Sequence, residues 1–351
     1  MTNNYLPIWE TTRGRSVESV HFGAIAIVAA NGKLLASYGD PHLVTFLRSS
    51  AKPLQALPFI ELGGDQTYHL TSKEIAILCA SHVGTEDHVA VVRGIQEKVG
   101  IRESDLLCGI QPPLDTATAE RLKARGEAFT PNHHNCSGKH SGMLAQARLR
   151  GLPIADYINP QHPVQQTILE YVSAMCALPA EQIEIGIDGC SAPTFALPLY
   201  HAALGFARLC DPRGMAVERM AACQRIVQSM LAYPEMVSGE GHFDTRLMQV
   251  GAGRILAKGG AEGYQAIGLM PGVLTPDSPG VGIAFKISDG DAAGRVRPAV
   301  GIEILRQVGV LNEKELEALA AFGPRKEVQN WRKLTVGESH PVFVLQRSAT
   351  P

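Results

Sequence analysis

The segments that read as β-strands lie near the two ends of the chain, and this placement most limits the folds open to it. Near the N-terminus, two apolar runs flank Asn31-Gly32 in HFGAIAIVAANGKLLASYG. An Asn-Gly pair between such runs is the strongest short-range signal for a β-hairpin. Strand-like runs return at YQAIGLM, VGIAFKI and PVFVLQ, beyond residue 263. We therefore expect one sheet to which both ends of the chain contribute strands.

The middle of the chain carries helix signals instead. Thr71 and Glu74 form a capping box ahead of IAILCA, and Thr85 is placed to cap EDHVAVVRGIQEKVG. Apolar residues recur at helical spacing in HPVQQTILEYVSAM and MAVERMAACQRIVQSML. Two further helices, PAVGIEILRQVG and NEKELEALAAFG, are expected between the last two strands. Strands and helices do not alternate along the chain as they do in a Rossmann fold.

These elements predict an α/β fold of the α+β kind, in which an antiparallel sheet is flanked by helices. Residues 1–48 and 264–351 would form the sheet-containing region. Residues 49–263 would form a largely helical inserted region. A chain of 351 residues is long enough to bury a large core in this arrangement.

Composition argues against several partners and compartments. The formal net charge is −2 and there is no long basic run, so neither nucleic acid nor an anionic membrane surface is an expected partner. The N-terminus lacks the features of a signal peptide, and no stretch approaches the roughly 18 apolar residues of a membrane span. The seven cysteines are scattered and odd in number, unlike a disulfide framework. We expect a cytoplasmic protein with mostly reduced thiols.

The first candidate for chemistry is the Ser49–Lys52 stretch in FLRSSAKPLQALP. If Ser49 starts a helix, residues three apart share a face, and the Lys52 amine can reach the Ser49 hydroxyl. A lysine accepts a serine proton only if burial or a nearby cation keeps the amine neutral. The alternative is a capping serine beside a solvated lysine, because Ser-x-x-Lys is expected about once by chance in a chain of this length.

Two polar loops suggest a metal site. The residues concerned are Asn135, Cys136, Lys139 and His140 in HHNCSGKHSGM, ahead of the helix MLAQARLRG, and Asp188, Cys190 and Ser191 in GIDGCSAPTFALP. Zinc accepts two thiolates, a nitrogen and a water, which favours Cys136, His140 and Cys190 as ligands. The spacing fits no common zinc signature, so two unrelated reduced thiols are the alternative.

Two more segments carry polar groups of the same kinds. Ser81 and His82 follow the first capped helix in CASHVGTEDH, and Lys258 precedes two glycines in RILAKGGAEGY. In Ser-x-x-Lys enzymes a Lys-Thr-Gly triplet accompanies the nucleophile. Lys258-Gly259-Gly260 is similar but lacks the hydroxyl, and a plain turn is the alternative.

The motifs RSSAKPLQALP, CASHVG, NCSGKHSGM, DGCSAPTFALPL and AKGGAEG occur in an order and spacing that resembles the rhizobial-type (class 3, thermolabile) L-asparaginases. The resemblance extends from RGRSVESVHFG to GIAFKISDGD, nearly the whole chain. It implies a fold similar to serine β-lactamases, transpeptidases and related glutaminases, in which both regions form one catalytic unit. It also implies a homodimer that hydrolyses L-asparagine to L-aspartate and ammonia.

The resemblance further implies roles for individual residues. Two serine–lysine pairs would be catalytic, Ser49 with Lys52 and Ser81 with Lys258. Zinc would be held by Cys136, Lys139 and Cys190. Lysine is an unusual ligand because its amine must first lose a proton, so the resemblance and the preferences of zinc disagree about Lys139 and His140.

A small zwitterionic substrate also needs one site for its carboxylate and one for its ammonium group. Arg48 and Asp188 are the natural candidates, and His140 could contact the substrate or the surroundings of the metal. A glutaminase or a penicillin-recognising hydrolase remains an alternative, although the chain has neither Ser-Asp-Asn nor Lys-Ser/Thr-Gly. From a different class, the alternative is a metal-dependent binding module without activity.

Overall fold

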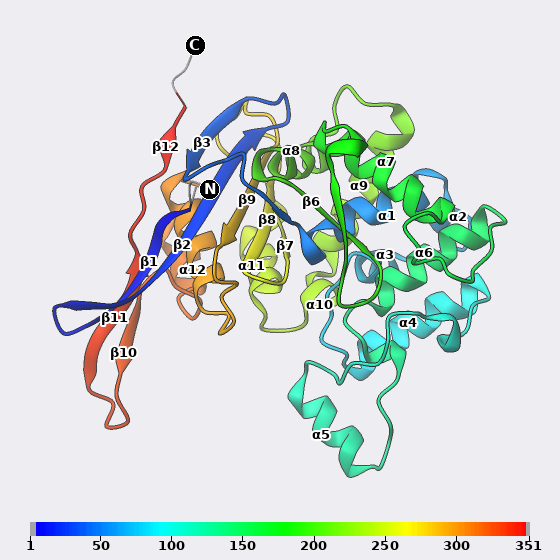
Figure 1. Ribbon diagram of the computed structural model, residues 1–351, viewed down its shortest axis with the longest axis horizontal. Coiled ribbons are helices and arrows are strands. Elements are labelled where there is room, and N and C mark those ends of the chain that lie inside the picture. Colours follow the sequence, from blue (N-terminus) through cyan, green and yellow to red (C-terminus); the bar gives the residue numbers. More distant parts are fainter. Residues whose placement is uncertain (1–4, 349–351) are drawn as a thin grey trace. The chain divides into compact units, whose positions relative to one another are not determined.

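The computed structural model describes residues 5–348, which form two compact units (Figure 1). The sheet unit takes in the described residues up to Ser50, then Leu197–Asp211, and those from Arg246 onward. The helical unit comprises Ala51–Ala196 and Pro212–Thr245. This division differs from the expected one, because residues 49–50, 197–211 and 246–263 belong to the sheet unit.

An antiparallel sheet forms the centre of the sheet unit, in the order β10-β11-β1-β2-β9-β8-β7, with β3 on β2 and β12 on β3. Figure 1 shows the blue N-terminal strands beside the red C-terminal ones, and Trp9 of β1 lies opposite Pro341 of β11. The prediction of one antiparallel sheet built from both ends is confirmed. The strands are β1 (Leu6–Arg13), β2 (Ser16–Ala29), β3 (Leu34–Tyr38), β7 (Ile255–Gly259), β8 (Tyr264–Leu269), β9 (Val281–Ile287), β10 (Lys326–Gln329), β11 (Thr335–Pro341) and β12 (Gln346–Arg347).

Helices α8 (Leu199–Cys210) and α12 (Val296–Gln307) pack on this sheet. Strand β9 is buried along its whole length, which explains why its sequence is apolar without alternation. Helix α8 approaches it so closely that a Cβ at Gly282 would lie 1.7 Å from the Ala203 carbonyl oxygen. The unit also contains α13 (Glu313–Ala318) and the short β4 (Val44–Phe46).

In the helical unit, α1 packs against α6, α7 and α9, and α3 packs against α4, α6 and α9. Both predicted caps are present: Thr71 makes its capping box with Glu74, and Thr85 caps the next helix with His88 in the third position. Strand β5 (Glu184–Ile187) pairs with β6 (Pro193–Pro198). The helices are α1 (Lys52–Glu61), α2 (Gly64–Thr67), α3 (Ser72–Leu78), α4 (Glu86–Val99), α5 (Thr116–Ala124), α6 (Ser137–Leu149), α7 (Pro163–Cys176), α9 (Val217–Ala232) and α10 (Pro234–Ser238); α11 (Phe243–Gly251) crosses the division.

Two local expectations were wrong. The segment expected as a loop before MLAQARLRG is the start of α6, because Gly138 lets this helix approach α3: a Cβ there would lie 2.1 Å from the Ile77 carbonyl oxygen. The expected strand PVFVLQ is mostly irregular. The Gln307 side chain instead bonds the Phe343 carbonyl at 2.9 Å and the Leu345 N–H at 2.8 Å, where a strand would use a neighbouring strand.

Within residues 5–348, the helices are all too short or too polar to cross a lipid bilayer.

Candidate active site

A buried lysine organises the polar groups of the helical unit. Lys52 begins α1 and is only 1% exposed. Its Nζ donates hydrogen bonds to the Ala80 carbonyl at 2.5 Å, to Ser81 Oγ at 3.0 Å and to the Asn135 carbonyl at 3.3 Å. The fold therefore joins three segments that the sequence analysis had selected separately. A lysine and a serine hydroxyl at this distance can exchange a proton.

The two adjacent serines have different surroundings. Both lie in a 3-10 turn, Arg48–Ala51, that precedes α1. Ser50 is fully buried, and its Oγ donates to the Lys258 carbonyl at 2.7 Å, which gives it a structural role. Ser49 is only half-buried and thus has the more accessible hydroxyl. Ser49 belongs to the sheet unit and Lys52 to the helical unit, so the pairing of their side chains stays a prediction.

Lys258 lies within β7 and is 1% exposed, with Nζ donating to the Gly259 carbonyl at 2.8 Å. The presence of two glycines after Lys258 has a steric explanation. A Cβ at Gly260 would lie 2.6 Å from the Leu47 carbonyl oxygen, so a side chain there would push the serine-bearing turn away from β7. Lys258 and Ser81 belong to different units, and their pairing also stays a prediction.

The predicted metal ligands come together in the helical unit. Sulfur or oxygen atoms of Cys136, Asp188 and Cys190 lie within 4.8 Å of one another, and Lys139 Nζ lies 2.9 Å from Cys190 Sγ. Both cysteines and Lys139 are buried, whereas Asp188 is half-buried. Two thiols with a nitrogen and a carboxylate form a donor set that suits zinc. Asp188, selected as a substrate-binding residue, therefore lies in the cluster that could hold a metal.

The charges in this cluster are coupled. The hydrogen bond from Cys190 lowers the pKa of the Cys136 thiol well below its usual value in spite of burial. The same bond, together with burial, raises the pKa of Cys190. Burial alone would lower the pKa of Lys139, but the charges of Cys136 and Cys190 outweigh it and raise that pKa. A metal that uses the Lys139 amine must therefore displace a firmly held proton.

Two histidines are buried in the same unit, and sequence reasoning gave a partner for neither. His140 is fully buried, and its Nδ1 lies 2.6 Å from the hydroxyl of Tyr157, a residue with no motif to mark it. His82 accepts a hydrogen bond from the Gly84 N–H on Nδ1 at 3.1 Å, and its Nε2 lies 2.8 Å from Ser137 Oγ. Burial lowers the pKa of both histidines well below the usual range, so both are neutral.

Arg48, selected for the substrate carboxylate, has a left-handed backbone, with φ of 51°. Its Nη1 lies 4.0 Å from Oε1 of Glu262, a residue that the sequence analysis did not select. The side chains are 26% and 68% exposed, so this ion pair contributes little to stability but leaves both charges accessible. Non-glycine residues with this backbone are uncommon and occur often at functional sites.

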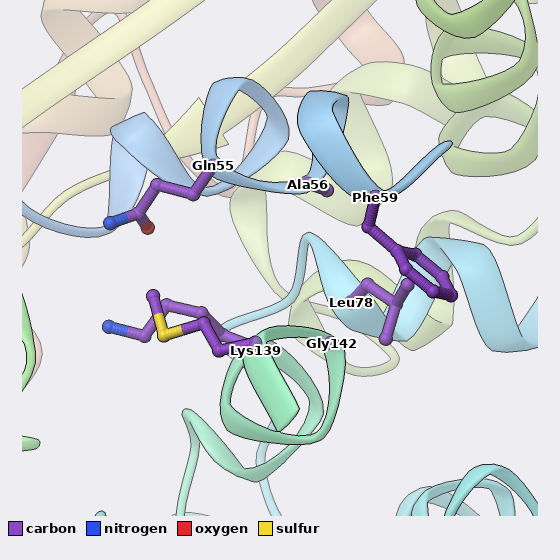
Figure 2. Close-up of a pocket in the computed structure, with 7 residues that line it drawn as sticks. Gln55, Ala56, Phe59, Leu78, Lys139 and Gly142 are labelled. Carbon is purple, nitrogen blue, oxygen red and sulfur yellow. The ribbon is translucent and has the colours of Figure 1, made fainter. Parts of the chain in front are cut away.

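A cavity of about 10 Å³ lies beside Lys139, lined by Gln55, Ala56, Phe59, Leu78, Lys139, Gly142 and Met143. Figure 2 shows the Lys139 and Gln55 side chains extending away from Phe59 and Leu78. This volume is the size of one water molecule, so the cavity cannot admit an amino acid.

Comparison with known proteins places the site in context. The sequence model of a family described as L-asparaginase II matches residues 9–341. A comparison with curated protein sequences gives no match.

Several solved structures show a distant similarity. A Bacillus glutaminase matches with a TM-score of 0.37 and 13% identity over 82% of this chain and 91% of that one. A structure of Mglu matches with a TM-score of 0.34 and 14% identity over 84% and 69% of the two chains. Mglu in its L-glutamate binding form matches with a TM-score of 0.34 and 16% identity over 82% of this chain and 58% of that one. The chain therefore spans less than two thirds of that protein. TM-scores this low carry no argument about shared architecture.

Proposed function

Because the chain belongs to the L-asparaginase II family and is an amidohydrolase, we propose that it hydrolyses L-asparagine to L-aspartate and ammonia. The observation that carries the proposal is the fully enclosed Lys52 amine, 3.0 Å from the Ser81 hydroxyl and next to the Ser49 turn in the chain. A lysine held against serine hydroxyls supplies the base that a serine nucleophile needs.

In the proposed reaction, the Lys52 amine first gives up one of its three protons. The Ser49 hydroxyl then attacks the side-chain amide carbon of asparagine, and the neutral Lys52 takes the serine proton. Backbone N–H groups hold the resulting oxyanion. Collapse of this intermediate breaks the C–N bond and leaves an acyl-enzyme, while the departing nitrogen gains a proton and leaves as ammonia. Water then cleaves the ester and regenerates Ser49.

Ser81 is the natural carrier of that proton. Its Oγ already accepts a hydrogen bond from Lys52, so a proton can pass from the lysine through the hydroxyl to the leaving nitrogen. Lys258 would hold Ser81 in place. In the second half of the cycle, the same groups would take a proton from the attacking water.

Substrate recognition would use charges of opposite sign. Arg48 would bind the α-carboxylate, because a guanidinium pairs well with a carboxylate. Asp188 would bind the ammonium group, and His140 would contribute a further contact. Glu262 is a carboxylate 4.0 Å from Arg48 in the same unit.

We also propose zinc as a cofactor, held by Cys136, Lys139 and Cys190. A bound zinc ion would supply positive charge close to the substrate. The buried pair of thiols supports this proposal. The family resemblance further supports a fold related to serine β-lactamases and a homodimer. The scattered, odd-numbered cysteines support a cytoplasmic location.

The amide substrate is tested by ammonia release from purified protein with L-asparagine, L-glutamine and a chromogenic β-lactam. We expect turnover of asparagine and little or none of the β-lactam. Faster release from glutamine would make the protein a glutaminase. No ammonia from either amide would favour a metal-binding module without activity.

The ligand set is tested by metal analysis of purified variants. Cys136→Ser and Cys190→Ser should each lose most of the bound zinc, because both thiolates are needed. Lys139→Met should lose it too, since it removes the amine at similar length. His140→Gln should retain the metal but bind substrate less well.

The matched controls are Cys79→Ser, Cys108→Ser and Cys176→Ser, which remove buried thiols outside the proposed ligand set and should leave metal content unchanged. Metal retained in Lys139→Met but lost in His140→Gln would replace Lys139 by His140 as the third ligand.

A further inference from the structure

The hydrogen bonds of Tyr157 determine where its proton goes. Its phenolic oxygen accepts a bond from the Leu107 N–H at 2.9 Å and lies 2.6 Å from His140 Nδ1. Tyr157 is fully buried, and burial raises its pKa, so the hydroxyl keeps its proton. The Leu107 amide is a donor and cannot receive that proton. The Tyr157 hydroxyl therefore donates to His140 Nδ1.

This bond defines the tautomer of His140. A neutral imidazole carries one proton, and Nδ1 acts here as the acceptor, so the proton resides on Nε2. Among residues 5–348, Nε2 has no hydrogen-bond partner, although His140 is fully buried. An unpaired buried N–H is costly and uncommon in folded proteins, and a ligand is one reason for its presence.

The ring is also held in place. It meets the Tyr157 ring edge-on, with centroids 5.6 Å apart and an interplanar angle of 80°. Gln165 Nε2 bonds the Tyr157 carbonyl at 2.8 Å, which anchors the tyrosine from α7. His140 directly follows Lys139, a proposed metal ligand, in α6. The N–H therefore lies on the helix that carries one of the proposed metal ligands.

We propose that Tyr157 is a positioning residue that locks His140 in the Nε2–H tautomer, so that His140 donates a hydrogen bond to an acceptor oxygen of the substrate. The identity of that substrate rests on the proposed asparaginase function. While the lock holds, Nε2 cannot bind a metal because it carries the proton. His140 is then a donor for substrate and not the third ligand.

The tautomer is tested directly by NMR of protein labelled with ¹⁵N-histidine. The chain has 12 histidines, and the signals that vanish in His140→Gln identify His140. In the wild-type protein, these signals should show a protonated Nε2 and an unprotonated Nδ1. Tyr157→Phe should abolish this single state. A protonated Nδ1 in the wild type would overturn the proposal, and this measurement needs no folded variant of Tyr157.

The functional link is tested by a double-mutant cycle on asparagine hydrolysis. Tyr157→Phe should lower kcat/KM about tenfold, chiefly by raising KM. A tenfold loss corresponds to about one hydrogen bond to a charged substrate. Gln at position 140 keeps an N–H that does not depend on a tautomer. In the His140→Gln background, Tyr157→Phe should therefore lower kcat/KM by no more than about twofold. Losses that multiply fully in the double variant would show that Tyr157 acts only on the fold.

Tyr38→Phe is the matched control, because the Tyr38 hydroxyl donates one bond to the Pro7 carbonyl at 2.6 Å in the sheet unit. It should leave kcat/KM unchanged. If the protein does not hydrolyse asparagine, the asparaginase proposal fails while the NMR result still decides the tautomer. If asparagine is hydrolysed but Nδ1 is protonated, only the positioning role fails.

Discussion

Ser49→Ala is expected to lower asparagine hydrolysis by several orders of magnitude while the protein still folds. The proposed nucleophile acts as one unit with Lys52 and Ser81, and loss of one member of such a unit removes most of the benefit of the others. The Ser49 side chain is half-buried and fills no part of the core, so its removal should barely change the melting temperature. Steady-state ammonia release and thermal unfolding measure the two effects.

Ser50→Ala, at the position adjacent to Ser49, is the control. Its hydroxyl donates to the Lys258 carbonyl, and loss of one such buried bond costs about 1 kcal/mol of stability. We expect a slightly less stable protein with a far smaller loss of turnover than in Ser49→Ala. Retention of more than about a tenth of the wild-type rate in Ser49→Ala, a barrier change under about 1.4 kcal/mol, would remove Ser49 as the nucleophile.

Lys52→Arg should lose activity as completely as Lys52→Ala. A guanidinium keeps the positive charge but stays protonated, so it cannot take a proton from serine. The Lys52 amine is also enclosed by three oxygen acceptors, and the larger planar group cannot reproduce that geometry. Ammonia release from all three proteins, together with their melting temperatures, tests the prediction.

Lys73→Arg is the matched control for charge and size. Lys73 is partly exposed and pairs with Asp87 at 3.0 Å in the same unit, so arginine should replace it without loss of activity. An active Lys52→Arg enzyme would contradict the role of Lys52 as a base. Its contribution would then be electrostatic, and proton transfer would have to be assigned to another group.

The elements predicted correctly have causes that lie within a few residues. The hairpin at Asn31-Gly32 depends on Gly32, whose φ of 89° favours glycine, and β2 and β3 pair across it. The caps at Thr71 and Thr85 depend on side chains three residues further on. The two wrong expectations depended on distant contacts, namely the approach of α6 to Ile77 and the hydrogen bonds of Gln307.

In the candidate site, too, some residues were identified from the sequence and others only from the structure. Cys136, His140 and Cys190 stand in motifs, and their residue types alone suggested a metal. Only the family resemblance implied Lys139 as a ligand. Tyr157 stands in no motif, and nothing in its neighbouring residues distinguishes it from an ordinary turn residue. Glu262 stands in the motif AKGGAEG, but no role was assigned to it there from the sequence. Their importance arises from what they face after folding, which a single sequence does not report.

By itself, the sequence determined the local elements, the contribution of both chain ends to one sheet, and the set of groups available for chemistry, since these depend on residue type and short-range spacing. Only the tertiary structure decided which groups meet. Lys52 and Ser81 are 29 residues apart in the chain, and His140 and Tyr157 are 17 apart. Such pairs form because burial of the surrounding apolar side chains packs the helices together, and that packing has no signature in any one segment.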